Sequence, residues 1–446
     1  MTASFTRPAA AVAALGLILI AAPAWAQQPV RSMTDAPAAP ISLGDAARLA
    51  AGRAPSAVGA RARAFQGDAR VAQVRSEFLP QLGTEATMDG GPEATALPTG
   101  TYLGGAPRMV SERTVDVRLQ ATQRLFDLPT LRRLRATSTE ADAIAYSAVA
   151  AEEQAATRGA LAYLELQRAD ARVAARLADS SLAAELLGIA RQQLTAGTAI
   201  ALDVTRAESQ LASTVSQLIA ARSARARAEL ELHHALALPL RGSLQLADSL
   251  RAPGAEAVTD EQAAIQTAMN RRGDLLSAGT HAEAARREIG AVKAERLPVV
   301  QLFSTAASTR DGVFDNRAYG ISVSLNLFDG FRRDARVAEY RAREREADAE
   351  WQDLKLRIEV DVRGALVDLA AAREQVTAAD LQLHLAEQEV EQARERFRAG
   401  VAGNADVIQA SLTLNHARDI AVDARTTWHR ARVQLAAAQG IVTEIN

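Results

Sequence analysis

The chain of 446 residues contains no cysteine. We therefore expect no disulfide bonds and no lipid on an N-terminal cysteine, so any membrane attachment has to come from the fold. The 51 basic and 53 acidic residues nearly balance, which excludes the basic excess that nucleic-acid-binding proteins show. Aromatic residues make up only 4% of the chain, and beyond the N-terminal region no run of 18 apolar residues occurs, so no transmembrane helix is expected.

Signatures of catalysis and of cofactor binding are also missing. The sequence has no G-x-S-x-G motif, no phosphate-binding loop and no cysteine nucleophile. The six histidines are scattered, and none forms a metal-ligand spacing with another. We therefore predict no enzyme activity, no cofactor and no metal site.

Residues 1–26 have the features of a secretory signal peptide. Arg7 supplies a positive charge, residues 9–22 are apolar, and Ala24-Trp25-Ala26 fits a cleavage site. The apolar segment is shorter than the about 20 residues that a spanning helix needs, and an uncleaved anchor is the alternative. We expect an exported protein in which a linker at 27–42 follows the signal peptide.

The rest of the sequence is an internal duplication. Leu125-Phe126-Asp127 recurs as Leu327-Phe328-Asp329, and LTAGTAIALDV at 194–204 recurs as FRAGVAGNADV at 397–407. Two copies are too few for a solenoid, so we interpret them as a duplicated large unit. Proline, glycine and serine gather between the copies, which indicates a linker.

Both copies predict the same order of elements: short helices, two strands, a very long helix, an Ala-Gly turn and a return helix. The first repeat covers 43–240, with strands at about 80–92 and 110–126, a long helix at about 129–195 and a return helix at about 201–237. A linker at 241–258 precedes the second repeat at 259–446, with strands at about 298–309 and 317–328 and helices at about 331–399 and 404–440.

The helices are long because prolines are rare. The next proline after Pro129 is Pro239, and none follows Pro298. A helix over 129–195 is about 100 Å long, too long for the core of a globular domain. Large apolar residues and alanines recur at steps of four and three, which is typical of a coiled-coil seam. The seam of the second copy is Val362, Ala365, Leu369, Ala372, Val376, Ala379, Leu383, Ala386, Val390, Ala393 and Phe397.

At the matching positions of the first copy, eight of eleven residues keep this character, and the return helix of the second copy repeats the pattern. The eight residues are Ala162, Leu166, Ala169, Val173, Ala183, Leu187, Ala190 and Leu194. The return-helix residues are Val407, Ala410, Leu414, Ala417, Ala421, Ala424, Trp428, Ala431, Leu435 and Ala438. The predicted fold is mainly α with a small β part, made of duplicated antiparallel coiled-coil hairpins and four strands per chain.

The segments VDVRLQATQR at 115–124 and ISVSLNL at 321–327 alternate apolar and polar residues. A barrel strand between lipid and water alternates in this way, and so does a soluble two-sided hairpin. The export signal and the aromatic residues Phe126 and Phe328 at the strand–helix junctions favour the membrane barrel, because such aromatics mark the membrane interface. Four strands cannot close and open edges are not tolerated in lipid, so several chains must share one barrel.

The duplication, the two Leu-Phe-Asp junctions and the turns AGTAIALDV and AGVAGNADV resemble the TolC-like outer-membrane efflux proteins over about residues 41–442. The resemblance implies a homotrimer that forms one α-barrel/β-barrel tube in the outer membrane of a Gram-negative bacterium. It also implies docking to a periplasmic adaptor and, through it, to an inner-membrane transporter of the RND, ABC or a similar class, for efflux or type I secretion. The sequence departs from the family pattern at Ala54-Pro55, Gly273-Asp274, Leu128-Pro129 and Gly330-Phe331.

The candidate functional residues lie at the hairpin turns. Ala196, Gly197 and Thr198 in the first copy and Ala399, Gly400 and Val401 in the second are expected to dock the adaptor, although ordinary helix ends look the same. Asp203, Asp406, Asn404 and Arg398 are expected to line the periplasmic entrance of the pore. Asp203 and Asp406 also suit the first turn of a helix, but a ring of carboxylates favours cations.

Two functions follow from these expectations. The first is a passive, gated duct that exports substrates through the outer membrane and opens when its helical tips move apart. The alternative is a periplasmic coiled-coil protein that tethers or supports without a membrane pore. The nature of the exported substrate does not follow from the sequence.

Overall fold

The computed structural model describes residues 40–89, 114–198, 200–252, 254, 260–309, 312–399, 401 and 403–445. Several predicted features lie outside these residues. They are the signal peptide at 1–26, most of the linker at 27–42, the strand ends at 90–92 and 110–113, most of the inter-repeat segment 253–258 and Gly400.

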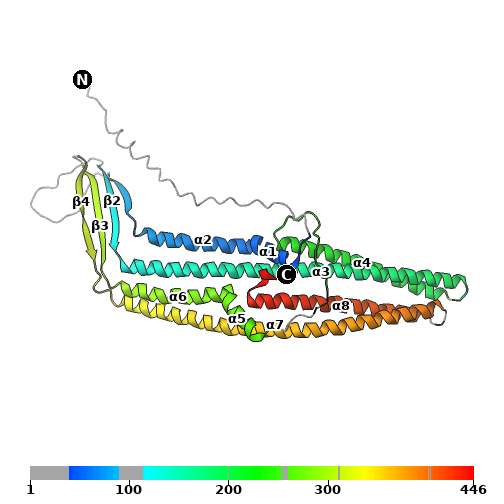
Figure 1. Ribbon diagram of the computed structural model, residues 1–446. Coiled ribbons are helices and arrows are strands. Elements are labelled where there is room, and N and C mark those ends of the chain that lie inside the picture. The colour runs from blue at the N-terminus through cyan, green and yellow to red at the C-terminus, as the bar shows by residue number, and fades with distance from the viewer. Residues whose placement is uncertain are drawn as a thin grey trace, which may run out of the picture.

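The two halves of the chain contain the same elements in the same order (Figure 1). The first half has α1 (Leu43–Arg53), α2 (Pro55–Ser76), β1 (Gln81–Asp89), β2 (Thr114–Phe126), α3 (Leu128–Thr195) and α4 (Ala201–Ala235). The second half has α5 (Glu261–Arg271), α6 (Gly273–Ala294), β3 (Val299–Thr309), β4 (Gly312–Ser324), α7 (Arg332–Arg398) and α8 (Asn404–Gln439), followed by a 3-10 turn at Val442–Glu444.

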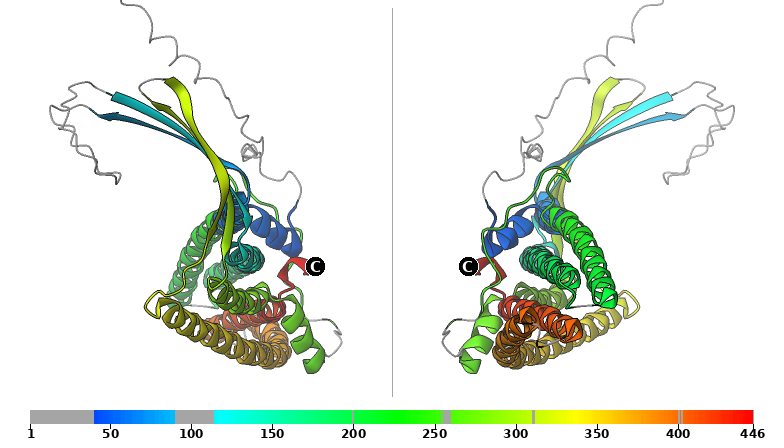
Figure 2. Two further views of the ribbon diagram at one scale, coloured as in Figure 1. Left: turned by 90° about the vertical axis from the view of Figure 1, so that its left-hand side faces the viewer. Right: turned by 90° about the vertical axis from the view of Figure 1, so that its right-hand side faces the viewer.

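The helices form one elongated layer, and the sheet lies at one end of it (Figure 1). Near the sheet, α3 packs between α2 and α6, and α6 also packs against α7. Farther away, α3 packs between α4 and α8, and α8 also packs against α7. The layer therefore has α2 and α4 along one edge and α7 along the other, while the sheet projects to one side of the helices (Figure 2).

The four strands form one antiparallel sheet in the order β1-β2-β3-β4, so the two repeats join between β2 and β3. Cross-strand partners share a face, and the register pairs Leu82 with Ala121 and Leu302 with Ile321 on one face. Glu85 and Arg118 pair on the opposite face. One face is therefore apolar and the other polar, as the alternation predicts.

The fourth strand differs from its prediction of about 317–328. It begins at Gly312 and ends at Ser324, so Leu325–Phe328 lie outside it although their alternation continues that of the strand. The reason lies in the neighbouring strand, because Ser324 pairs with Val299, the first residue of β3. Pro298 precedes it and has no backbone N–H with which to extend the ladder.

The seams are buried as predicted. All ten seam residues of α8 are buried, and in α7 only Leu369, Leu383 and Ala393 are partly exposed. In α3, five of the eight seam residues are buried and Leu194 is exposed near the end of the helix. Val376, Ala379, Ala424 and Trp428 share one apolar cluster, which shows a large residue packing over alanine across the α7–α8 hairpin.

Gly159 marks a close helix crossing and offers a test of the packing. A Cβ atom at Gly159 would lie 2.5 Å from the Cβ of Ala50 in α1 and 2.9 Å from the carbonyl oxygen of Ala46. We expect Gly159→Ala to destabilise the protein by about 1–3 kcal/mol through overpacking, seen as a lower midpoint of thermal unfolding by circular dichroism.

Gly188 in the same helix is the matched control, since no atom lies within 4 Å of its Cβ position. Gly188→Ala should raise the midpoint slightly, because alanine favours a helix over glycine by about 1 kcal/mol. If the two variants change stability equally, the close packing of α1 on α3 is wrong.

Candidate functional site

The two hairpin turns lie together at the end of the molecule that is farthest from the sheet (Figure 1). Gly197 has φ +75°, and the Thr198 N–H donates to the carbonyl oxygen of Gln193 at 2.9 Å. In the second turn, the Val401 N–H donates to the carbonyl oxygen of Arg396 at the same distance. The first long helix thus ends in the glycine-type cap that its Ala-Gly pair predicts, and the second ends with the equivalent backbone bond. The turn residues Ala196, Gly197, Thr198, Ala399 and Val401 are exposed, and Gly400 lies outside the described residues.

The two tips are bonded to each other across the hairpins. The side-chain amide of Asn404 donates to the carbonyl oxygen of Asp203 at 2.7 Å, and that of Gln193 donates to the carbonyl oxygen of Phe397 at 2.7 Å. Asn404 is only 1% exposed, and its Oδ1 atom has no partner among the described residues. In the single chain, Asn404 therefore lies inside the contact between the tips rather than on an open surface.

An apolar cluster completes the contact between the tips. It joins residues of the first hairpin with residues of the second, namely Leu186, Leu187, Ala190, Ala207, Phe397 and Val407. Arg398 does not pair with a tip aspartate. It contacts Glu185 of α3 at 2.5 Å, and Arg394 contacts the same carboxylate at 3.0 Å.

The tip carboxylates Asp203 and Asp406 lie in the first turns of the return helices. Asp203 accepts a long hydrogen bond of 3.5 Å from the Ile200 N–H, and Arg206 is 3.9 Å away. Asp406 is exposed. Both carboxylates suit the positive end of a helix, and neither has a close cationic partner among the described residues, so both leave negative charge at the tip.

Farther up the hairpins, a buried carboxylate joins α3 to α8. Asp179 is 0% exposed and accepts from Arg176 at 2.9 Å and from Arg418 of α8 at 2.6 Å. With the Asn415 amide assigned from its surroundings, its nitrogen lies 2.6 Å from Asp179 Oδ1. Burial raises the pKa of Asp179, and the hydrogen bond and charge of Arg418, with Arg176, act in the opposite direction.

Further ion pairs continue this contact along the same two helices. Arg168 and Arg172 of α3 both donate to Asp423 of α8, at 2.9 and 3.0 Å. Arg176 also pairs with Asp419. Each hairpin is therefore held by an apolar seam, whereas the contact between the hairpins combines the apolar cluster at the tips with a run of ion pairs.

This ionic contact was not among the predictions from the sequence, although the sequence contains a signal for it. The three α3 positions that break the predicted seam are Gly159, Arg176 and Ser180. Arg176 belongs to the Asp179 cluster, and Gly159 belongs to the crossing with α1. Two of the three interruptions of the heptad pattern thus mark places where α3 contacts a helix other than α4.

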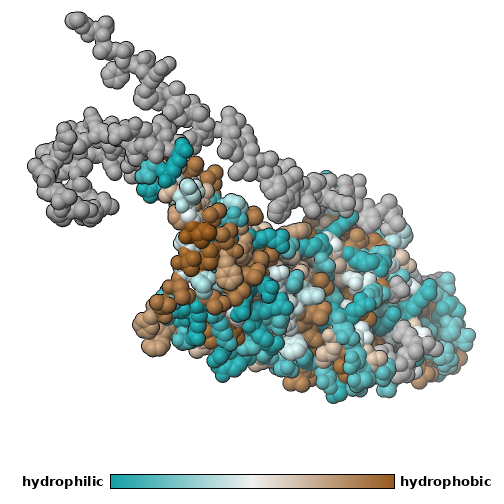
Figure 3. Space-filling model, turned by 60° about the vertical axis from the view of Figure 1, so that its left-hand side comes forward, coloured by the Kyte–Doolittle hydropathy of each residue, from teal (hydrophilic) through white to brown (hydrophobic). Residues whose placement is uncertain are grey.

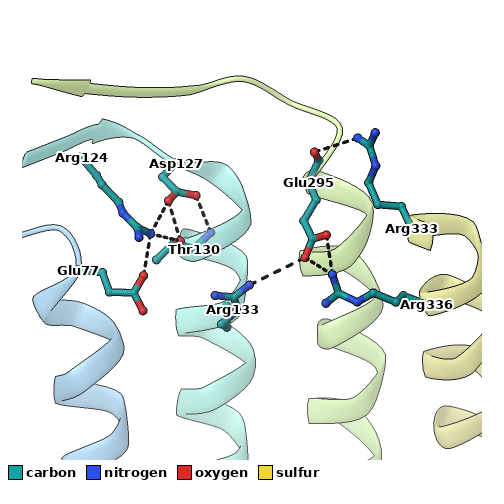
Figure 4. Close-up of polar contacts among 8 residues, drawn as sticks. All are labelled: Glu77, Arg124, Asp127, Thr130, Arg133, Glu295, Arg333 and Arg336. Carbon is teal, nitrogen blue, oxygen red and sulfur yellow. Dashed lines mark hydrogen bonds and ion pairs between the residues drawn. The ribbon is translucent and has the colours of Figure 1, made fainter. Parts of the chain in front are cut away.

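The aspartate of the first Leu-Phe-Asp motif caps the first long helix (Figure 4). Its carboxylate accepts from the Thr130 N–H at 2.9 Å and from the Thr130 hydroxyl at 2.7 Å. Arg124 donates to Asp127 and to Glu77 of α2, in both cases at 2.7 Å. Asp127 therefore ends β2 and begins α3.

The second motif uses a different partner. Asp329 accepts from the buried Arg333 guanidinium at 2.7 Å. Arg333 also donates to the carbonyl oxygens of Glu295 and Asn326, at 3.1 and 2.8 Å. Arg336 donates to the Glu295 carboxylate at 2.7 Å, which ties α7 to the end of α6 (Figure 4).

The aromatic residues at the junctions are exposed. Phe126 and Phe328 project from the structure, and Phe328 makes an edge-to-face contact with Phe331 at 5.6 Å between ring centroids. Phe331 has φ +64°, a left-handed conformation that costs a non-glycine residue about 1–2 kcal/mol. No pattern in the sequence indicated this conformation. The space-filling view shows the hydrophobic residues of the sheet end, in contrast to the more hydrophilic helices (Figure 3).

Neither a candidate metal site nor a membrane-spanning helix occurs among the described residues. No group of three or more His, Cys, Asp or Glu in that part of the chain is placed to hold a metal ion. Among the same residues, no helix combines the length and the apolar composition needed to cross a membrane.

Comparison with known proteins agrees with this architecture. Protein CyaE of Bordetella pertussis is 29% identical over 383 residues, which is 83% of this chain and 78% of CyaE. The pyoverdine export outer membrane protein OpmQ of Pseudomonas aeruginosa is 27% identical over 274 residues, 58% of this chain and 55% of OpmQ. The outer membrane channel CmeC of Campylobacter jejuni shares the fold, with a TM-score of 0.74 at 17% identity over 89% of this chain and 85% of that one.

The family model of the outer membrane efflux proteins matches residues 46–238 and 264–441, one segment in each half. This match favours the membrane duct over the tethering protein. By its sequence and its fold, the chain belongs to the outer membrane efflux protein family and acts as an outer-membrane efflux duct.

Proposed function

We propose that three copies of the chain close into one tube, which serves as the passive outer-membrane duct of a tripartite export or type I secretion system. Each chain has two repeats, 43–240 and 259–446, and each repeat contributes one helical hairpin and two strands to the tube. One observation carries the proposal. The two edges of the helical layer differ from each other and expose apolar side chains in the single chain, and the two edge strands of the sheet each have an unpaired side. The proposal includes no catalytic step, and a partner supplies the energy.

The α7 edge carries a second apolar stripe opposite its buried seam. These exposed residues are Leu356, Val360, Val367, Leu381 and Leu385. The other edge carries Val58 and Phe65 on α2 and Ile219 and Leu230 on α4. In the same way, β4 and β1 each pair on one side only within the described strands.

When one edge of a chain binds the different edge of the next, the chains associate head to tail. Such contacts form a closed ring if the rotation from one chain to the next divides a full turn evenly. Three copies bring twelve strands, an even number within the range of bacterial outer-membrane barrels. The apolar face of the sheet, with Leu302 and Ile321, then faces lipid, and the face with Glu85 and Arg118 faces the lumen. Phe126 and Phe328 lie at the periplasmic boundary of the membrane.

The tips are the sites where the duct meets its partners. We expect a periplasmic adaptor to dock on the exposed small residues of the two turns, Ala196, Gly197, Thr198, Ala399, Gly400 and Val401. The adaptor links the duct to an inner-membrane transporter of the RND, ABC or a similar class. OpmQ is named for export of pyoverdine, and the cargo of the present duct is a separate question.

Opening requires the two hairpins to move apart at the tips. Such movement has to separate the apolar cluster at the tips and also the ion pairs between α3 and α8, whose charged groups water can solvate once they part. The Asp179 cluster, the Asn404–Asp203 bond and the Glu185 pairs with Arg394 and Arg398 hold the closed arrangement. When these contacts part, Asp203, Asp406, Asn404 and Arg398 line the entrance.

Assembly tests the proposal directly. We expect the double variant Val360→Glu, Val367→Glu to fold its hairpins but to lose the trimer, because two charges per chain would be buried in each contact. Native mass spectrometry of detergent-solubilised protein measures the oligomer, and circular dichroism checks the helix content. Arg357→Glu makes a similar change in charge on a neighbouring face of α7 and should leave a trimer. A wild-type protein that remains a monomer would overturn the proposal.

The Asp179 cluster provides a test of gating. Asp179→Ala leaves Arg418 without its buried partner, a loss of about 3–5 kcal/mol for a buried pair, and should raise the open probability in planar bilayers at least tenfold. Glu208→Ala breaks an exposed pair with Arg191 at 2.7 Å within the first hairpin and is the matched control. Its effect should be small, since exposed pairs contribute about 0–1 kcal/mol. Equal effects of the two variants would show that the ionic contact does not hold the gate.

The tip carboxylates provide a test of selectivity. Three copies place six carboxylates from Asp203 and Asp406 around one entrance. We expect Asp203→Ala with Asp406→Ala to lower the preference for cations, seen as a reversal potential closer to zero in a salt gradient across a planar bilayer. Glu208→Ala, which removes a carboxylate from the side of the hairpin, serves as the control. Unchanged selectivity would remove the carboxylate ring from the proposal.

A further inference from the structure

One aromatic residue, Phe303 of β3, lies on the polar face of the sheet. It pairs with Thr122 of β2 and with Gly320 of β4. Because cross-strand partners share a face, this register places Phe303 on the same face as Glu85 and Arg118. In the proposed tube this face lines the water-filled lumen, so contact with lipid does not explain the phenyl ring.

Gly320 leaves room for the ring on the sheet. A Cβ atom at Gly320 would lie 3.2 Å from both Cε1 and Cζ of Phe303, closer than most Cβ atoms approach a neighbour. The ring therefore leans across β4, and Phe303 is partly buried there. An aromatic ring that covers a glycine also stabilises a sheet, but this contact uses only part of the ring. The remaining part is exposed on the polar face.

The first repeat shows that this position of the fold does not require an aromatic residue. Leu79-Pro80 precedes β1 as Leu297-Pro298 precedes β3, so Glu85 is the counterpart of Phe303. Glu85 lies opposite Arg118 in the sheet. The two repeats thus give the same face different chemistry, with opposite charges in the first and an apolar ring in the second.

The residues next to the ring can form hydrogen bonds but carry no charge. Gln301 and Thr305 flank Phe303 on the same face of β3, and Thr122 lies beside it on β2. Gln120 of β2 lies opposite Thr305. An apolar surface surrounded by neutral donors and acceptors suits a ligand that combines an aromatic group with polar substituents.

We propose that Phe303 is a binding position for cargo inside the barrel and that it favours molecules with an aromatic group. The inference rests on the proposed function, because three copies bring three such rings into one lumen. Twelve strands about 4.8 Å apart and tilted by about 40° enclose a barrel about 24 Å across, before side chains are counted. Cargo that crosses this lumen stacks its aromatic group on Phe303, while Thr122, Gln301 and Thr305 bond its polar substituents.

Current block in planar bilayers tests the inference on the assembled channel. Phenyltrimethylammonium is added on the extracellular side, and the concentration that halves the open-channel current is measured. We expect Phe303→Ala and Phe303→Leu to require about fivefold more of this probe than the wild type, because both variants lose the contact between rings. Tetramethylammonium carries the same charge without a ring, and its effect should be equal in all variants.

Two further variants serve as controls. Phe303→Tyr keeps the ring and should be blocked like the wild type. Leu302→Ala changes the neighbouring residue on the opposite, apolar face of the sheet and should also be blocked like the wild type. Native mass spectrometry confirms that each variant assembles, and Phe303→Leu retains most of the side-chain volume if Phe303→Ala does not assemble.

The contrary results are distinct. If Phe303→Leu is blocked as readily as the wild type, the ring binds no aromatic group and only covers Gly320, which overturns the inference and leaves the proposed duct intact. If Leu302→Ala weakens the block and Phe303→Leu does not, the orientation of the sheet in the proposed function is wrong and the inference falls with it. A wild-type protein that forms no conducting channel would overturn both.

Discussion

The constraint on which the architecture depends is the sheet with two open edges. In lipid no water is available to bond the free backbone groups of β1 and β4, so the edges have to be paired with other strands. The helical layer faces the same requirement in another form, because α7 on one side and α2 with α4 on the other expose apolar side chains. Since strand and helix edges fall on the same two sides of the chain, one head-to-tail contact satisfies both.

Beneath the sheet, two kinds of contact divide the mechanical roles. Large residues packed over alanines hold each hairpin along its length, and such interdigitated packing resists sliding. Between the hairpins, arginines of α3 meet aspartates of α8, with one carboxylate fully buried at Asp179. Breaking that contact leaves charges that water can solvate as the hairpins part. The proposed opening of the duct at its far end uses this difference, because the two hairpins then part as rigid units.

The sequence was most informative where contacts are local and repeat. Heptad spacing predicted the buried stripes of α7 and α8, and the Ala-Gly pairs predicted the turns, because caps and seams depend on residues a few positions apart. It was least informative where partners are far apart in the chain. Arg418 is 239 residues from Asp179, and Asn404 bonds a backbone carbonyl of the other hairpin. The end of β4 was misplaced for the same reason, since it is set by Pro298 before the neighbouring strand.

The two halves have diverged at the points where they do different work. Both junctions keep Leu-Phe-Asp, but Asp127 caps its helix through Thr130, whereas Asp329 binds Arg333 and the chain passes through a left-handed phenylalanine. At the tips, Ala201 of the first half corresponds to Asn404 of the second, and only Asn404 is buried with a bond to the other tip. The proposed ring of three chains therefore presents two unlike tips in alternation. In that ring, a partner that docks with a single kind of surface meets two chemically different sites in each chain, so the proposed entrance is only approximately sixfold.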